Sequence, residues 1–143
     1  MKTVRQLLEA KGFDVLSVRP DANVYDALLL MAEKKVGALL VLDADGHLAG
    51  IFSERDYARE VVIKGKTSKT TKISEIMSTT VITVSPDQLT DECMELMSDK
   101  RIRHLPVVEN GKVIGILSIG DLVKETITYQ QFLIEQLESY IQS

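Results

Sequence analysis

The sequence has little of what marks secreted, membrane or nucleic-acid-binding proteins. It contains one cysteine, which cannot form an internal disulfide, so nothing points to an oxidising compartment. No apolar run approaches the roughly 20 residues that cross a bilayer. The net charge of -4 argues against a basic surface for nucleic acid. We therefore expect a cytoplasmic, soluble protein with no nucleic-acid or membrane partner.

The remaining composition is that of a small globular protein. Of the 143 residues, 45% are hydrophobic and 27% are charged, a balance typical of soluble domains. This length fits one domain or two very small ones. The first residues predict a short amphipathic helix ended by Gly12, and they lack the apolar core of a signal peptide.

The sequence contains an internal duplication. Residues at a shift of 66 positions match from the first half to the second, and after one residue is lost in a turn the shift becomes 65. The matching pairs are Val18 with Val84, Pro20 with Pro86, Asp21 with Asp87, Met31 with Met97, Val41 with Val107, Gly50 with Gly115, Ser53 with Ser118, and Asp56 with Asp121. Matches in this order indicate two copies of one structural unit.

Each copy predicts the element order β-α-β-β-α. An extended piece leads to a helix with apolar residues at three-and-four spacing, then to two β-rich runs around Asp45-Gly46 or Asn110-Gly111. A second helix follows from Ser53 or Ser118. In the second copy, Ser85, Pro86 and Gln88 predict a capping box with proline at the first helical position.

The two copies are expected to pack together. A unit of about 60 residues is marginal alone because it buries only about 60% of its unfolded surface. We predict an α/β (α+β) fold of two units packed through their sheets about a pseudo-two-fold axis, plus terminal helices. The expected bounds are 11–63 for the first unit, 64–72 for a basic surface linker, 73–125 for the second unit and 126–143 for a C-terminal amphipathic helix.

Two segments carry a family resemblance. Gly50-Ile-Phe-Ser-Glu-Arg-Asp56 and Gly115-Ile-Leu-Ser-Ile-Gly-Asp121 resemble the Gly-apolar-apolar-Ser/Thr-x-x-Asp pattern of CBS (cystathionine β-synthase) domains. Arg101-Ile-Arg-His-Leu-Pro-Val-Val108 is similar to the second strand of that unit. A tandem pair of this kind is called a Bateman module. The resemblance implies two clefts that take adenosine ligands such as AMP, ADP, ATP, NAD or S-adenosylmethionine, and association of two pairs into a homodimer.

The Ser-x-x-Asp segments have two interpretations. Each lies where a strand turns into a helix, and a helix N-terminus suits phosphate. Ser53 and Ser118 can add a phosphate donor, while the carboxylates of Asp56 and Asp121 can accept both ribose hydroxyls. The same spacing is also a helix capping box, so these aspartates can equally cap their helices. The duplication in register favours nucleotide binding.

The copies differ at the start of the second strand. Val36, Gly37 and Ala38 align with Ile102, Arg103 and His104. The resemblance implies that Arg103 and His104 bind phosphate near the pseudo-axis, with Arg101 a weaker candidate. The alternatives are a solvated strand edge for the arginines and a structural role for the histidine.

The other candidates follow from the same resemblance. Arg55 either reaches a phosphate or pairs with Glu54 or Asp56, and Gly120 replaces it in the second copy. Lys64 and Lys66 either cover an anionic ligand or keep a loop hydrated, and we favour the second interpretation. The residues that the resemblance places around adenine are Leu16, Ser17, Val36, Gly37, Ala38, Ile82, Thr83, Leu105 and Pro106.

Three hypotheses remain for the function. The favoured one is a non-catalytic sensor that binds an adenine nucleotide and signals to an unknown protein target by a change of shape or assembly. The second is a structural dimerisation module with vestigial clefts. The third is an enzyme, but the sequence contains no phosphate loop, no nucleophile–base pair and no zinc-ligand spacing. We expect no catalytic cofactor and no metal.

Overall fold

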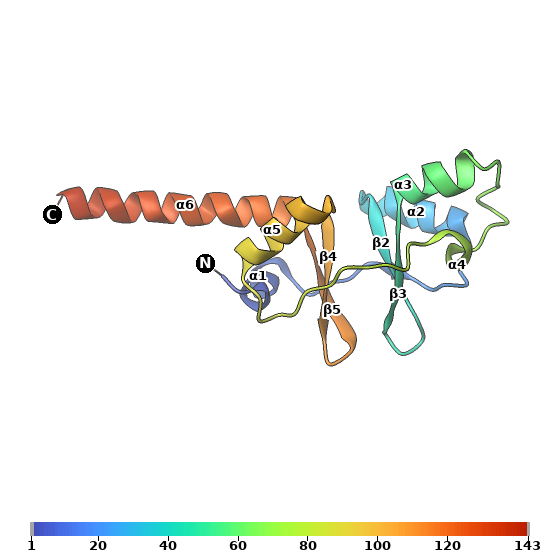
Figure 1. Cartoon of the computed structure of the whole chain (residues 1–143), viewed down its shortest axis with the longest axis horizontal. Coiled ribbons are helices and arrows are strands. Elements are labelled where there is room, and N and C mark those ends of the chain that lie inside the picture. The colour runs from blue at the N-terminus through green and yellow to red at the C-terminus, as the bar shows by residue number, and fades with distance from the viewer. Residues whose placement is uncertain (1, 143) are drawn as a thin grey trace. The chain divides into compact units, whose positions relative to one another are not determined.

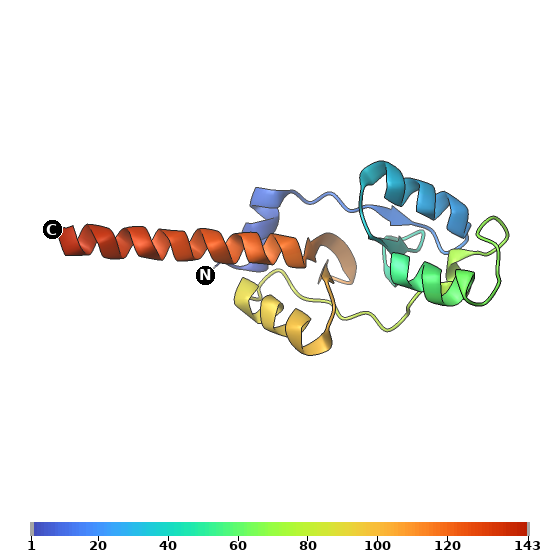
Figure 2. The same cartoon turned by 90° about the horizontal axis from the view of Figure 1, so that it is seen from above.

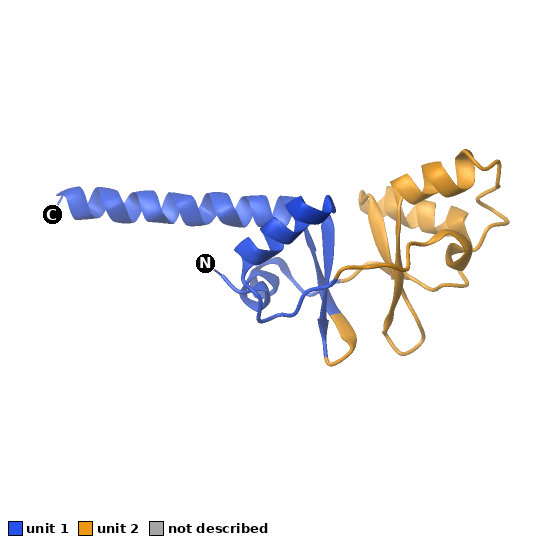
Figure 3. Cartoon of the chain, in the orientation of Figure 1, with its two compact units in different colours: residues 1–14, 83–109, 114–143 blue, residues 15–82, 110–113 orange. Residues whose placement is uncertain are grey.

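The computed structural model describes residues 2–142, which form two compact units (Figure 3). Unit 1 contains Met1–Asp14, Thr83–Glu109 and Ile114–Ser143, and unit 2 contains Val15–Ile82 and Asn110–Val113. Unit 2 is built on the first sequence repeat and unit 1 on the second.

Unit 2 is a small sheet covered by helices (Figure 1). Its elements are β1 (Ser17–Val18), α2 (Val24–Lys34), β2 (Ala38–Leu42), β3 (Leu48–Ser53), α3 (Glu54–Asp56), the π-helical turn η1 (Tyr57–Val62) and α4 (Ile73–Ile76). The strand order is β1-β2-β3, with β1 parallel and β3 antiparallel to β2. The side chain of Asn23 caps α2 through the N–H of Asp26.

The core of unit 2 lies between this sheet and its helices. It uses the predicted apolar face of α2, including Val24, Ala27 and Met31, against Leu39 and Phe52. All five side chains are at most 3% exposed. The helical spacing read from the sequence therefore identifies the packed face correctly.

Unit 1 has the same parts in a less regular form. Its elements are α1 (Val4–Lys11), α5 (Thr90–Lys100), β4 (His104–Glu109), β5 (Lys112–Ser118), of which Ile114 and the residues after it belong to this unit, and α6 (Ile119–Gln142). Strands β4 and β5 form a two-stranded sheet. Asn110 and Gly111 both have positive φ at the turn between them, as the Asn-Gly pair predicts.

The backbone pairings confirm the duplication. Val18 pairs in parallel with Val41, and Val84 pairs in parallel with Val107, at the same shift of 66 positions. Likewise, Glu54 donates its N–H to the carbonyl of Gly37, and the corresponding bond joins Ile119 to Arg103. The two repeats therefore place equivalent residues together, each within its own unit.

The helix that precedes each repeat packs with the other repeat. In unit 1, Val4 of α1 donates its N–H to the carbonyl of Gln88 at 2.8 Å. In unit 2, Ile73 of α4 donates to Ala22 at 2.9 Å. Both Val4 and Ile73 are fully buried. The chain thus exchanges its leading helices between repeats, an arrangement that the aligned repeats do not reveal.

Two helix predictions need correction. The segment from Ser85 to Gln88 is a hydrogen-bonded turn, in which Gln88 Oε1 accepts the N–H of Ser85, and α5 starts only at Thr90. The predicted hydrogen bond between Ser85 and Gln88 therefore forms, but it closes a turn that precedes the helix instead of capping the helix. In addition, α6 runs without a break from Ile119 to Gln142, so the repeat's second helix and the terminal helix are one element.

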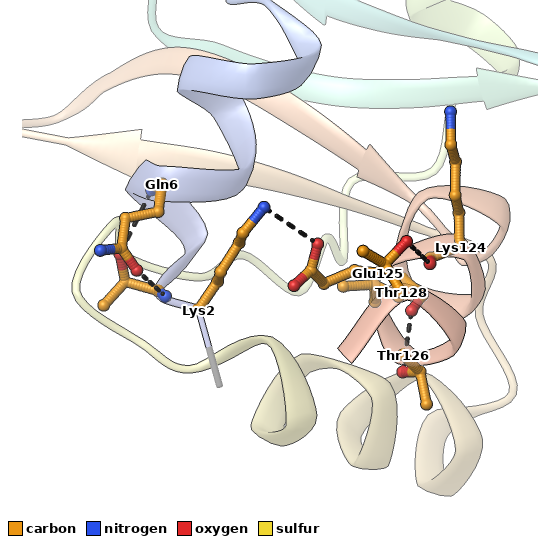
Figure 4. A network of polar contacts seen from close by, with 8 residues as sticks. Lys2, Gln6, Lys124, Glu125, Thr126 and Thr128 are labelled. Atoms are coloured by element: carbon orange, nitrogen blue, oxygen red, sulfur yellow. Dashed lines mark hydrogen bonds and ion pairs between the residues drawn. The ribbon is translucent and has the colours of Figure 1, made fainter. Parts of the chain in front are cut away.

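The C-terminal half of α6 extends away from the rest of unit 1 in both views (Figures 1 and 2). Its apolar side chains stay exposed, with Ile134 at 48%, Leu137 at 62% and Ile141 at 80%. Near its start, by contrast, Glu125 is buried and pairs with Lys2 at 3.3 Å (Figure 4). Across residues 2–142, no helix combines the length and apolar character that a membrane span needs.

Candidate functional site

The Ser-x-x-Asp turn of unit 2 forms a complete capping box. The N–H and hydroxyl of Ser53 both donate to Asp56 Oδ2, at 2.9 and 3.1 Å, and the N–H of Asp56 donates to Ser53 Oγ at 3.3 Å. The other carboxylate oxygen, Oδ1, accepts a hydrogen bond from the Ser78 hydroxyl at 3.2 Å. The capping interpretation of the sequence is thus correct, and it engages only one oxygen of the carboxylate.

The equivalent turn of unit 1 has the same box with an additional cation. The backbone N–H of Ser118 donates to Asp121 Oδ2 at 2.8 Å, and the backbone N–H of Asp121 donates to Ser118 Oγ at 3.1 Å. Lys11, the last residue of α1, places Nζ 2.6 Å from the same Oδ2 and 2.5 Å from the carbonyl oxygen of Ile116. The side chain of Asp121 is 24% exposed and that of Lys11 31% exposed.

The ion pair sets the charge of this turn. Partial burial raises the pKa of Asp121, but the hydrogen bonds from Lys11 and Ser118 outweigh it, so the net pKa is below its usual value. Burial and the nearby Lys11 charge lower the pKa of His104. The turn therefore holds a carboxylate of lowered pKa, paired with Lys11, beside an imidazole whose pKa is also lowered.

Lys11 is the residue that sequence reasoning missed. It lies 110 positions before Asp121 and outside the duplicated motifs. A lysine in the last turn of a helix ordinarily signals only a favourable interaction with the helix dipole. Nothing in the repeat alignment indicates that α1 packs with the second repeat, so no sequence feature would have found it.

The predicted phosphate residues of the second repeat lie at the edge of this turn. The backbone carbonyl of Arg103 accepts the N–H of Ile119 at 2.8 Å, which holds the residue before β4 beside the N-terminus of α6. Arg103 is exposed and His104 is half-buried. Arg101 instead ends α5 in a left-handed conformation, with φ 54°, and precedes the strand.

The Ser-x-x-Asp turn of the first repeat has different charged residues from the turn of the second repeat. Glu54 lies next to Gly37, so that a Cβ added at Gly37 would be 3.8 Å from the Glu54 carboxyl carbon. Arg55 is exposed and forms no ion pair with Glu54 or Asp56 within residues 2–142. The turn of unit 2 thus carries two carboxylates and the guanidinium of Arg55, whereas that of unit 1 carries one carboxylate paired with Lys11.

The predicted adenine residues divide into framework and accessible positions. Ser17 pairs with Leu40, and Ala38 pairs with Ser53, which places the start of β2 against the turn. Leu105 is fully buried and Pro106 is buried, so the side chain of Leu105 belongs to the core. The half-buried positions are Leu16, Ser17, Val36 and Ile82, and Gly37 and Thr83 are exposed.

Two other groups have structural explanations. Lys64 forms an ion pair with Glu60 four residues earlier, and both Lys64 and Lys66 are exposed, which fits the hydrated-loop interpretation. Asp43 accepts the N–H groups of Asp45 and His47 at 2.9 Å and so closes the β2–β3 turn.

Comparisons with known proteins agree with the internal repeat. The CBS domain family matches the chain twice, over residues 4–63 and 73–127. A solved structure of a protein with CBS domains from Burkholderia ambifaria MC40-6 is 53% identical, with a TM-score of 0.83, and the match covers 89% of this chain and 95% of that chain. A second solved CBS domain, NE2398, is 46% identical with the same TM-score, over 88% of this chain and 98% of the other.

Among curated proteins, the mitochondrial protein CBSX3 of Arabidopsis thaliana is 38% identical over 98% of this chain, which spans 72% of its length. The chain spans only 25% of a longer Arabidopsis relative, CBSCBSPB2, at 34% identity. The two family matches together cover most of the sequence and coincide with the two repeats. The chain therefore belongs to the CBS domain family and contains a pair of CBS domains, a regulatory module.

Proposed function

We propose that this CBS pair binds an adenosine nucleotide (AMP, ADP, ATP or NAD) at the Ser-x-x-Asp turn of each repeat and signals without catalysing a reaction. The observation that carries the proposal is the geometry of Asp56 and Asp121. Each carboxylate uses Oδ2 to close its capping box and keeps Oδ1 outside the box. A carboxylate oxygen at such a turn is a suitable acceptor for ribose hydroxyls.

A relative supports the choice of ligand class. The solved CBS domain pair of protein MJ0100 is a complex with 5′-methylthioadenosine and S-adenosyl-L-methionine. At 24% identity and a TM-score of 0.78, that structure shares the fold of this chain. Adenosine is the chemical group common to both of its ligands and to the nucleotides proposed here.

The signalling step follows from linkage. A ligand changes the conformation or assembly of a protein only by its difference in affinity for two states, typically about 1–3 kcal/mol of coupling. The proposed recipient is a separate, unknown protein target. We also propose a cytoplasmic location, which agrees with a single buried cysteine that forms no disulfide.

The alternative of a structural module is favoured by one observation: both aspartates close complete capping boxes with serines of the chain itself. An enzymatic role has less support. Cys93 is fully buried and burial raises the pKa of its thiol to about 11, which makes it a poor nucleophile.

Thermal unfolding with added ligands tests the proposal. We expect at least one of AMP, ATP, NAD and S-adenosylmethionine to raise the unfolding midpoint by about 9 °C at a concentration one hundred times its Kd, because ligand binding to the native state stabilises it by about 2.7 kcal/mol. GMP and inorganic phosphate at equal concentrations control for ionic effects. An unchanged midpoint with all four compounds at millimolar concentration would leave the structural module as the better account.

We further propose that two copies of the chain associate as a homodimer through α6. Ile127, Ile134 and Ile141 recur every seven residues on this helix, with Leu137 on the same side, and all are exposed. Isoleucine and leucine at these heptad positions favour packing between two like helices. Assembly occurs elsewhere in the family, since a CBS-CP12 protein from bloom-forming cyanobacteria is hexameric.

A charge placed in this seam should prevent dimer formation. We expect light scattering at micromolar concentration to give twice the chain mass for the wild type and the single chain mass for Ile134→Asp. Gln136→Asp adds the same charge to the opposite side of the helix and should leave the dimer intact. A dimer that persists in Ile134→Asp with an unchanged dissociation constant would show that association uses another surface.

A further inference from the structure

The ion pair between Lys11 and Asp121 lies where the proposed function puts a ribose. Lys11 reaches Asp121 Oδ2 from α1, 2.6 Å away, and is held in place by its second bond to the Ile116 carbonyl. The pair is only partly exposed. Any ligand that uses Asp121 therefore meets this ammonium group at the same time as the carboxylate.

A ribose that uses both oxygens of Asp121 competes with Lys11. A carboxylate offers about four lone-pair directions, and Oδ2 already accepts the N–H of Ser118 and the ammonium of Lys11. The two directions left on Oδ1 can take both ribose hydroxyls, whereas a ribose that places one hydroxyl on each oxygen must displace Lys11 from Oδ2. A displaced ammonium without a new partner loses a charge-assisted hydrogen bond in a partly buried place, which costs binding energy.

The turn of the first repeat has no such cation. Within residues 2–142, Asp56 takes part in no ion pair, and its Oδ1 accepts only the neutral hydroxyl of Ser78. Its neighbour Glu54 adds a second negative charge beside Gly37. The two turns thus share one capping box but differ in their cations, because Lys11 is paired with Asp121, whereas the exposed Arg55 next to Asp56 is not paired with it within residues 2–142.

We propose that Lys11 belongs to the ligand site of the second repeat and makes it select phosphorylated ribonucleosides over unphosphorylated ones. This inference rests on the proposed function. A phosphate group gives the displaced Lys11 a new anionic partner, whereas a bare ribonucleoside gives it none. The backbone carbonyl of Arg103 accepts the N–H of Ile119, so the backbone of a second basic residue lies next to the same turn. At the first repeat no cation is paired with Asp56 within residues 2–142, so selectivity that depends on displacing such a cation is absent there.

Calorimetric titration of the second site alone provides the test. In an Asp56→Asn background, AMP and adenosine are titrated as probes into the chain with Lys11 present and with Lys11→Met. We expect AMP to bind at least tenfold more tightly than adenosine when Lys11 is present. Lys11→Met should reduce this ratio about tenfold, because AMP loses a partner for its phosphate while adenosine no longer competes with an ion pair. Lys11→Arg should restore the ratio.

Two controls separate selectivity from a general loss of structure. Lys2→Met removes the ion pair to Glu125, which joins the N-terminal segment to α6 in the same unit (Figure 4), and it should leave the ratio unchanged. In an Asp121→Asn background, where only the first site is left, Lys11→Met should also have no effect. Circular dichroism and thermal midpoints confirm that each variant is folded.

The outcomes distinguish this inference from the proposed function. If AMP and adenosine both bind the Asp56→Asn chain and their ratio is the same in Lys11→Met, Lys11 has no role in selectivity, although adenosine binding stands. If neither compound binds this chain at millimolar concentration, the proposed function itself fails for the second repeat and the inference fails with it.

Discussion

Replacement of Gly50 by alanine is expected to lower the free energy of unfolding by about 2–3 kcal/mol, the range found when atoms are forced into a packed interior. A Cβ at this position would lie 2.7 Å from the carbonyl oxygen of Ser78 and 2.9 Å from Met77 Sδ. Ser78 cannot move away easily, because its N–H and carbonyl both bond to Ile51 at 2.9 Å. Denaturant unfolding measures the change.

The matched control is Gly37→Ala. A Cβ at Gly37 would meet only the Glu54 carboxyl group at 3.8–4.0 Å, an ordinary contact. Its effect should stay within about 0.5 kcal/mol. Gly115→Ala should fall between the two, since it meets the Leu8 methyl groups at 2.8 Å, and a side chain can shift where a backbone cannot. Equal losses for Gly50→Ala and Gly37→Ala would contradict the close approach described for this segment.

Asp56→Asn and Asp121→Asn are each expected to weaken ligand binding at their own repeat by roughly a hundredfold. Loss of a charged acceptor for two hydroxyls removes about 3 kcal/mol, and each 1.4 kcal/mol is a factor of ten. Asparagine keeps an oxygen that can accept the N–H of Ser53 or Ser118, so the helix cap remains. Calorimetric stoichiometry should fall from two ligands per chain to one in each single variant.

The fold of the variants can be checked independently. Asp121→Asn also breaks the ion pair with Lys11, but a partly exposed pair contributes only about 0–1 kcal/mol to stability. Thermal midpoints within a few degrees of the wild type are therefore expected for both variants. Two ligands bound with wild-type affinity in either variant would show that the carboxylate is only a helix cap.

Much of the fold can be predicted from the sequence because each repeat contains local patterns that are typical of its helices and turns. Apolar residues at Val24, Ala27 and Met31 predict the buried face of α2, and the Asn110-Gly111 pair predicts its turn. The start of α5 was not readable in the same way. The hydrogen bond between Gln88 and Ser85 can form both in a turn and at the start of a helix. The backbone bonds from α1 to this segment favour the turn.

The sequence predicts the motif residues of the site but not the residues from other segments that contact them. Asp56 and Asp121 were identified by duplication, and each lies at its strand–helix turn as expected. Their differing partners, Ser78 and Lys11, come from segments outside the motif and from the exchange of leading helices. Such contacts depend on long-range packing, which neither spacing nor composition encodes.

Native mass spectrometry with AMP tests the central claim most directly, because it counts ligands on each chain. The account predicts up to two AMP molecules on each wild-type chain and none on the Asp56→Asn/Asp121→Asn double variant at the same concentration. Equal AMP occupancy on the double variant, or no binding of AMP, ADP, ATP or NAD to the wild type at millimolar concentration, would contradict it.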